Sequence, residues 1–196
     1  MIGRLLAVLP LLLFSLTCGA AESPSLRSGV FSPPRLAPDF SLRGSDGSAL
    51  KLSRYRGKVV ALGFGYSFCP DICPTTLMYL AKAKEKLGAT GKDFQVIYVT
   101  VDPERDSVDR LRNYLAGFDP TFMGATGSSE QLADVRKAYG IQVSKQPPRD
   151  GNPSVYFVHH SSFVYLIDRG GDLRAMMPYG ISVDDIAHDV KALLSK

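Results

Sequence analysis

The stretch that decides both the fold and the chemistry of this 196-residue chain is Gly63-Phe64-Gly65-Tyr66-Ser67-Phe68-Cys69-Pro70-Asp71-Ile72-Cys73-Pro74. It follows the apolar run Val-Val-Ala-Leu at 59–62, which predicts a strand over residues 58–66 that is covered on both faces. Because proline is well tolerated at the start of a helix, a helix is predicted from about Pro74 to Leu87. The two cysteines therefore lie where a buried strand leads into a helix, with Cys73 as the expected cap residue and Cys69 in the turn before it.

This position favours a chemical role for the two cysteines. The partial positive charge at a helix N-terminus lowers the pKa of nearby thiols and favours the thiolate, which redox reactions and soft metal ions both require. The alternative is a structural disulfide or a pair of inert buried thiols. The prolines that follow each cysteine argue against burial inside a regular element. Strand-to-helix turns also lie at the edge of a sheet where ligands bind, so the chemical interpretation is favoured.

The composition predicts one globular domain and excludes several function classes. The chain is 45% hydrophobic and has a modest formal charge of +4. Its lysines and arginines are scattered, without the basic and aromatic clustering typical of proteins that bind nucleic acid, so we expect no nucleic-acid partner. Besides the pair, the only cysteine is Cys18. Three cysteines are too few for a disulfide framework or for a four-sulfur zinc site.

The first 21 residues have the pattern of a secretory signal peptide, with Arg4, an apolar core at 5–16 and small residues at 19–21. Cleavage is predicted after Ala20 or Ala21. An uncleaved membrane anchor is the alternative, although the apolar stretch is short of the roughly 20 residues that span a bilayer. Lipidation at Cys18 is a third option, but the residues before it make a poor lipid-attachment box. We therefore expect an exported protein, either periplasmic or membrane-anchored and facing the periplasm, where thiols are exposed to oxidation.

After the leader, residues 22–36 are predicted to be a flexible linker because they are rich in Ser, Pro and Gly, and residues 37–196 a folded domain. The domain is predicted to open with a β-hairpin over residues 40–42 and 49–52. Further strands are predicted over residues 94–101, 122–126, 155–160, 162–168 and 173–177, and further helices over residues 106–116, 128–140 and 182–194. Residues 145–153 are predicted to form a loop. This order indicates an α/β fold with a central mixed sheet flanked by helices.

Several motifs together resemble the Sco/SenC family of copper chaperones, which have a thioredoxin-like fold. The strongest is Phe68-Cys69-Pro70-Asp71-Ile72-Cys73-Pro74. The supporting motifs are Ala37-Pro38-Asp39-Phe40, Val101-Asp102-Pro103-Glu104-Arg105-Asp106, and His160 within the strand-like residues 158–167. The resemblance covers residues 37–194. The Asp-Pro-Glu-Arg-Asp string has good turn and cap chemistry, so we interpret Asp102 and Arg105 as architecture near the site and not as ligands.

The resemblance implies a copper ion, Cu(I) or Cu(II), bound by Cys69, Cys73 and His160. It also implies delivery to the dinuclear copper centre of cytochrome c oxidase subunit II or another copper-site apoprotein, or reduction of the cysteines of that centre. An upstream copper donor or a thiol reductant would then be a further partner, close to the membrane. The chemistry is consistent, because two thiolates and one imidazole suit copper(I) whereas structural zinc normally takes four protein ligands.

One residue departs from the family pattern. His159 stands where the family usually has an acidic residue before the ligand histidine. Because neighbouring residues of a strand face opposite sides, only one of the two histidines can face the cysteines without distortion. The resemblance favours His160. His159 is expected at the surface or at the rim of the metal site, and a role as an alternative ligand stays open.

Two other functions compete with a metallochaperone. The first is an exported thiol–disulfide oxidoreductase or redox sensor that uses Cys69 and Cys73. Reductases of this fold typically have Cys-x-x-Cys, whereas here three residues intervene, although a disulfide can still form if the two Cα atoms lie within about 7 Å. The second is a peroxiredoxin-like peroxidase, which ranks last because the usual threonine or serine three places before the cysteine is replaced by Tyr66. We therefore interpret the chain as a metallochaperone rather than an enzyme.

Overall fold

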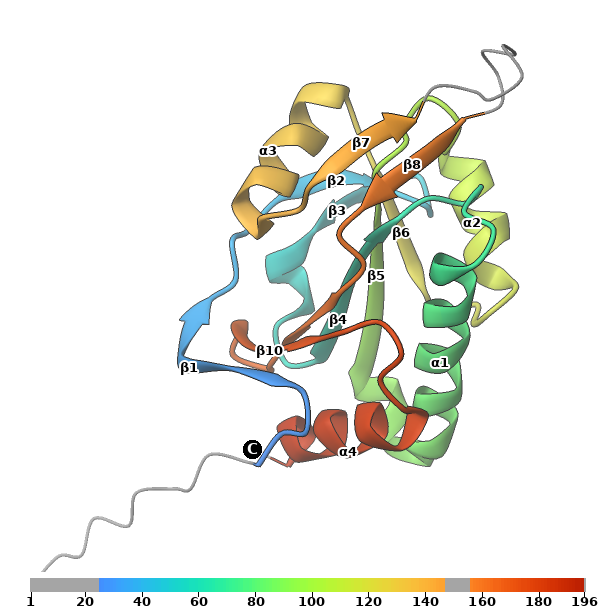
Figure 1. Ribbon diagram of the computed structural model, residues 1–196. Helices are drawn as coiled ribbons and strands as arrows, with labels where there is room; N and C mark the ends of the chain where they lie inside the picture. Colours follow the sequence, from blue (N-terminus) through green and yellow to red (C-terminus); the bar gives the residue numbers. More distant parts are fainter. Residues whose placement is uncertain (1–24, 147–155, 196) are drawn as a thin grey trace, which may run out of the picture.

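A computed structural model describes residues 25–146 and 156–195, which form a mixed sheet with helices around it (Figure 1). The sheet has eight strands in the order β1-β10-β9-β4-β5-β6-β2-β3. In chain order these are β1 (Gly29–Leu36), β2 (Ser41–Gly44), β3 (Ala49–Lys51), β4 (Val59–Gly65), β5 (Phe94–Thr100), β6 (Met123–Thr126), β9 (Val164–Ile167) and β10 (Asp172–Met177). A separate antiparallel ribbon consists of β7 (Val143–Gln146) and β8 (Phe157–His160).

The described residues also form four α-helices: α1 (Ile72–Lys86), α2 (Val108–Ala116), α3 (Ser129–Tyr139) and α4 (Val183–Leu194). Two short 3-10 helices are η1 (Leu52–Tyr55) and η2 (Gly88–Asp93). Strands β4, β5 and β6 are parallel neighbours, while β9, β10, β2 and β3 pair antiparallel. The predicted α/β class, with a mixed sheet and an N-terminal hairpin of β2 and β3, is confirmed.

The two central strands are buried along their whole length. They pair in register from Val59 opposite Phe94 to Gly65 opposite Thr100. Their continuous apolar sequences therefore correspond to a sheet covered on both faces. Because both strands end at the same edge, the segments that follow Gly65 and Thr100 lie beside each other, and this edge carries the cysteines.

Helix α1 begins earlier than the sequence predicts. Asp71 is the cap residue, and the first helical hydrogen bond runs from Thr75 N to the Asp71 carbonyl at 3.1 Å. Cys73 is therefore the second residue of the helix and not its cap. The physical reason is that none of the first-turn N–H groups has an intrahelical partner, so Pro74 loses no hydrogen bond inside this turn. This placement buries Cys73 in the core and leaves Cys69 in the preceding turn.

The other three described α-helices start close to the predicted residues, and each is capped by a serine. The hydroxyls of Ser107, Ser128 and Ser182 each accept a hydrogen bond from the backbone N–H three residues later. Helix α3 ends at Gly140, whose φ of 68° lies in the left-handed region that glycine adopts readily. Cap chemistry is local, which is why the sequence predicts these starts well.

Two segments differ from the sequence prediction. Residues 29–36, expected to be part of a flexible linker, form the edge strand β1 against β10. Just before it, buried Asp189 of α4 accepts hydrogen bonds from the backbone N–H groups of Arg27 and Ser28 at 2.7 and 3.0 Å. Most side chains of β1 are exposed, so its sequence lacks the alternation that marks a half-buried strand. Residues 145 and 146, expected in a loop, are the end of β7; residues 147–153 of that loop and the leader lie outside the described residues.

Candidate metal centre

The fold brings Cys73 and His160 together although 87 positions separate them in sequence. Cys73 comes from the first turn of α1 and His160 from the end of β8, and Cys73 Sγ lies 3.4 Å from His160 Nε2. The other ring nitrogen, Nδ1, lies 2.8 Å from the Ser161 carbonyl oxygen. A carbonyl can only accept a hydrogen bond, so Nδ1 carries a proton, and in the neutral ring Nε2 is then the unprotonated nitrogen beside the sulfur. This is the tautomer that a metal-ligating histidine needs.

Cys69 lies in the turn before α1 and is partly exposed. The largest influence on its thiol is a hydrogen bond with the Cys73 side chain. The His160 side chain and the backbone N–H groups of Asp71 and Cys73 make further hydrogen bonds to it. These hydrogen bonds outweigh burial and lower the pKa of Cys69 to about 3. For Cys73 the same pairing with Cys69, together with burial, raises the pKa. The pair therefore holds one thiolate, on the more exposed sulfur, and one thiol.

The three predicted ligands are neighbours, but their side chains are not arranged around a common metal position. Within residues 25–146 and 156–195, no group of three His, Cys, Asp or Glu side chains is arranged tightly enough to hold a metal ion as it stands. Cys73 and His160 are in contact, and Cys69 is close enough to both to have its pKa set by them. The arrangement is therefore a buried sulfur in contact with a half-buried imidazole, with a partly exposed third donor beside them.

A surface cavity of about 250 Å³ opens beside this pair. Cys69, His159 and His160 are among the residues that line it, together with the exposed ring of Phe157. His159 itself is exposed, whereas His160 is half-buried, as the alternation along a strand requires. Of the two histidines, His160 contacts Cys73, and His159 lies on the lining of the cavity.

Asp102, Arg105 and Tyr156 fix the beginning of β8. Buried Asp102 accepts hydrogen bonds from Arg105 Nε at 2.5 Å and from the Tyr156 hydroxyl at 2.7 Å. Arg105 Nη1 donates to the Tyr156 carbonyl at 3.1 Å, and the guanidinium carbon lies 3.6 Å from the Tyr156 ring centroid. Further along, the backbone N–H of Val158 donates to the Tyr66 hydroxyl at 3.2 Å. These contacts hold the strand that carries His160 against the end of β4.

A second network fixes the turn that carries Cys69. Buried Asp106 accepts hydrogen bonds from the Ser67 hydroxyl at 2.6 Å and from the Thr100 hydroxyl at 2.7 Å. Burial raises the pKa of Asp106. The exposed ring of Phe68 lies between two guanidinium groups, 4.8 Å from that of Arg105 and 4.3 Å from that of Arg110. The sequence marks Asp102 and Arg105 as architecture but gives no signal for Tyr156 or Ser67, whose partners are distant in sequence.

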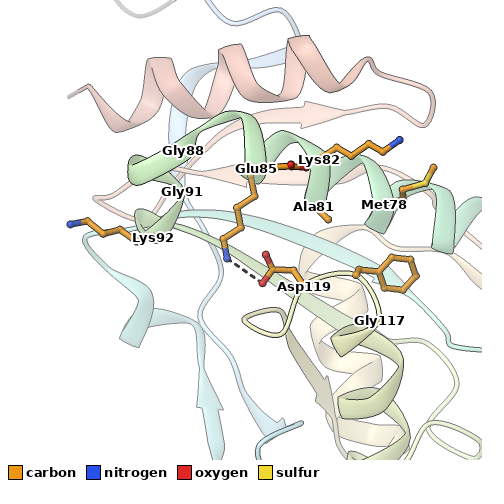
Figure 2. Close-up of a pocket in the computed structure, with 11 residues that line it drawn as sticks. Met78, Ala81, Lys82, Glu85, Gly88, Gly91, Lys92, Gly117 and Asp119 are labelled. Atoms are coloured by element: carbon orange, nitrogen blue, oxygen red, sulfur yellow. Dashed lines mark hydrogen bonds and ion pairs between the residues drawn. The ribbon is translucent and has the colours of Figure 1, made fainter.

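A larger cavity, of about 570 Å³, lies elsewhere, between α1, η2 and the connection from α2 to β6 (Figure 2). It contains the ion pair of Lys84 and Asp119, at 3.4 Å. Among its described lining residues there is no cysteine and no histidine. The candidate metal centre is therefore at the edge of the sheet and not in this cavity.

The chain is similar to proteins of one known family. The family model described as SCO1/SenC matches residues 31–195. An SCO2-like protein of Rickettsia conorii is 34% identical over 137 residues, which are 70% of this chain and 66% of that protein. The matched region thus spans just under two thirds of that relative.

Two solved structures are also similar. ScoI of Bradyrhizobium japonicum, solved with copper bound, has a TM-score of 0.74 and 31% identity, over 81% of this chain and 99% of that chain. BsSco, a member of the Sco family of cytochrome c oxidase assembly proteins in which a disulfide switch was identified, has a TM-score of 0.65 and 25% identity, over 83% of this chain and 95% of that chain. The predicted thioredoxin-like fold is thereby confirmed. With the family match covering nearly all of the described residues, this chain belongs to the SCO1/SenC family.

Proposed function

We propose that this protein binds one copper ion through Cys69, Cys73 and His160 and delivers it to a copper-site apoprotein during assembly of cytochrome c oxidase. The observation that carries the proposal is the contact of 3.4 Å between Cys73 Sγ and His160 Nε2, with the Cys69 sulfur beside them. The copper-bound structure of a relative and the oxidase-assembly role of another support it. The recipient we propose is the dinuclear copper site of subunit II.

The donor set fits copper. Thiolate sulfur selects copper(I), and imidazole nitrogen suits copper in both oxidation states. Cys69 is already a thiolate, and His160 Nε2 already presents its lone pair. Only Cys73 must lose a proton, so copper uptake at neutral pH is expected to release about one proton from the thiol pair. Three protein ligands also leave copper open to a fourth ligand, unlike a closed structural zinc site.

The exposure of the ligands suggests the order of transfer. Cys73 is 4% exposed, whereas Cys69 lies on the cavity that opens to solvent. A recipient sulfur can therefore approach from the side of Cys69 while Cys73 and His160 still hold the ion. Cys69 would be released first and Cys73 last. Ligand exchange of this kind needs no redox step and no change in the fold.

A second function, thiol–disulfide exchange, is favoured by the lowered pKa of Cys69. Its thiolate would attack one sulfur of a partner's disulfide and release the other as a thiolate, which takes up a proton from water. Cys73 would then attack the mixed disulfide, lose its proton and release the second partner thiol. The product is a Cys69–Cys73 disulfide, so this protein is oxidised as the partner is reduced. The disulfide switch found in BsSco supports this alternative.

We also propose that residues 1–21 direct export. None of the helices described here is long and apolar enough to cross a membrane. Residues 1–24 lie outside the described residues, so this proposal depends on their sequence pattern. Cell fractionation of the full chain, with N-terminal sequencing of the mature protein, tests it. Recovery of the uncleaved chain only in the cytosol would contradict it.

The test of copper binding is a competitive copper(I) titration of the reduced protein. Wild type is expected to bind one equivalent tightly, and His160→Ala to bind it markedly more weakly. His159→Ala is the matched control, because it removes the neighbouring imidazole at the rim, and it is expected to keep the affinity of wild type. If His160→Ala binds copper as wild type does while both proteins exchange disulfides rapidly, the oxidoreductase function is the better account.

A further inference from the structure

The hydroxyl group of Tyr98 is buried beside the cysteines and has no hydrogen-bond partner among the described residues. Tyr98 comes from β5, opposite Gly63 of β4, and is 4% exposed. Its ring extends along β4, with Cδ2 against Gly63 and the hydroxyl over Gly65. A buried tyrosine hydroxyl normally finds a partner, because leaving it unpaired is unfavourable. The unpaired hydroxyl of Tyr98 therefore requires an explanation.

The sulfur of Cys73 is a neighbour of this hydroxyl. A methyl group added to Gly65 would overlap the Tyr98 hydroxyl and would lie 2.7 Å from Cys73 Sγ. The two atoms thus share the space above Gly65, which is open only because glycine has no Cβ. Cys73 is as buried as Tyr98, so no water competes for its sulfur from this side. Because both side chains are buried, the hydroxyl lies beside the sulfur within the core.

We propose that Tyr98 donates a hydrogen bond to the Cys73 thiolate when copper is bound, and so acts as a positioning residue that favours the cuprous ion. The inference rests on the proposed copper binding and deepens it. A thiolate buried without a donor is unfavourable, and the Tyr98 hydroxyl offsets this because it lies in the core beside it. Such a bond also withdraws electron density from the sulfur. Hydrogen bonding around a cysteine ligand is one of the means by which a protein sets the potential of a copper site.

Tyr114 provides a matched control. It is a half-buried tyrosine whose hydroxyl oxygen is itself buried and has no hydrogen-bond partner in the described part of the chain. Its ring centroid lies 6.4 Å from that of Tyr98. It comes from α2, and none of the three atoms nearest to a Cβ at Gly65 belongs to it. Removing its hydroxyl therefore makes the same chemical change in the same core without removing the proposed donor.

The experiment compares wild type, Tyr98→Phe and Tyr114→Phe with two readouts. In the copper-loaded proteins, Tyr98→Phe is expected to move the sulfur-to-copper(II) charge-transfer band to lower energy. It is also expected to lower the preference for copper(I) over copper(II), measured as the ratio of the two dissociation constants, by severalfold. Tyr114→Phe is expected to leave both unchanged. Equal behaviour of Tyr98→Phe and wild type, or equal shifts in both variants, would overturn the inference.

The second readout needs no metal and separates this inference from the proposed function. Raman spectra of the copper-free, reduced proteins report the S–H stretching band of Cys73. This band is expected to shift in Tyr98→Phe, because the Tyr98 hydroxyl and Cys73 Sγ lie over the same glycine, and not to shift in Tyr114→Phe. If wild type fails to bind copper but this shift occurs, the proposed function fails and the contact between Tyr98 and Cys73 stands. If wild type binds copper and neither the S–H band nor the charge-transfer band moves in Tyr98→Phe, the contact is refuted.

Discussion

Cys73 Sγ lies 3.4 Å from His160 Nε2, and this contact joins the first turn of α1 to the last residue of β8. Strand β8 does not belong to the main sheet; it pairs only with β7 among the described strands. The position of His160 therefore depends on what holds the β7–β8 ribbon against the end of β4. Copper affinity should accordingly respond to residues that never contact the ion.

Tyr156→Phe tests this dependence. The substitution removes the hydroxyl that donates to buried Asp102 at 2.7 Å, and a bond to a buried carboxylate of this kind stabilises by about 1–3 kcal/mol. We expect faster hydrogen exchange at the amides of residues 158–160 and weaker copper(I) binding. Tyr179→Phe, at an exposed tyrosine, is the control. Unchanged exchange over residues 158–160 would show that Tyr156 does not hold the ribbon.

Two glycines of β4 give a paired test of the packing behind Cys73. A Cβ at Gly65 would overlap the Tyr98 hydroxyl and crowd Cys73, whereas a Cβ at Gly63 would meet its nearest neighbour at an ordinary 3.6 Å. Gly65→Ala is therefore expected to destabilise the fold by about 1–3 kcal/mol and to weaken copper binding, because Cys73 must move. Gly63→Ala is expected to do neither. Denaturant unfolding and copper titration measure both effects, and equal stability of the two variants would contradict the packing described here.

The alkylation of Cys69 should depend little on pH. Because the pKa of Cys69 is lowered to about 3, this sulfur is a thiolate at any higher pH and is protonated only as the pH falls towards that value. Its rate of reaction with iodoacetamide should be nearly constant from about pH 5 to 8, whereas an ordinary thiol reacts about tenfold faster per pH unit over this range. In Cys73→Ala the stabilising thiol is lost, so the pKa of Cys69 should rise and the pH dependence should return. A tenfold rise of the alkylation rate per pH unit in wild type would contradict the lowered pKa of Cys69.

The sequence predicts most of the fold because its signals are local. The apolar runs of β4 and β5 and the serine caps of α2, α3 and α4 depend on residues within a few positions of one another. Strand β1 escapes prediction because it is an edge strand that contains two prolines and exposes most of its side chains. Its pairing is made by the backbone with β10, far along the chain.

The candidate site is predicted in part for the same reason. The two cysteines are recognisable from their place between a strand and a helix, and His160 from its motif. The residues that hold these ligands in place are not recognisable from the sequence. Their hydrogen bonds, from Tyr156 to Asp102 and from Ser67 to Asp106, each join segments about 40 to 50 positions apart. In the sequence, nothing distinguishes Tyr98 from other strand residues. Only the structure shows that its hydroxyl lies above Gly65.

X-ray absorption of the copper(I)-loaded protein tests the central claim most directly, because it identifies the atoms bound to copper. We expect two sulfur ligands and one imidazole nitrogen in wild type and in His159→Ala, and loss of the imidazole contribution in His160→Ala. Retention of that contribution in His160→Ala, or a wild-type copper ion bound by sulfur alone, would contradict a site built from Cys69, Cys73 and His160.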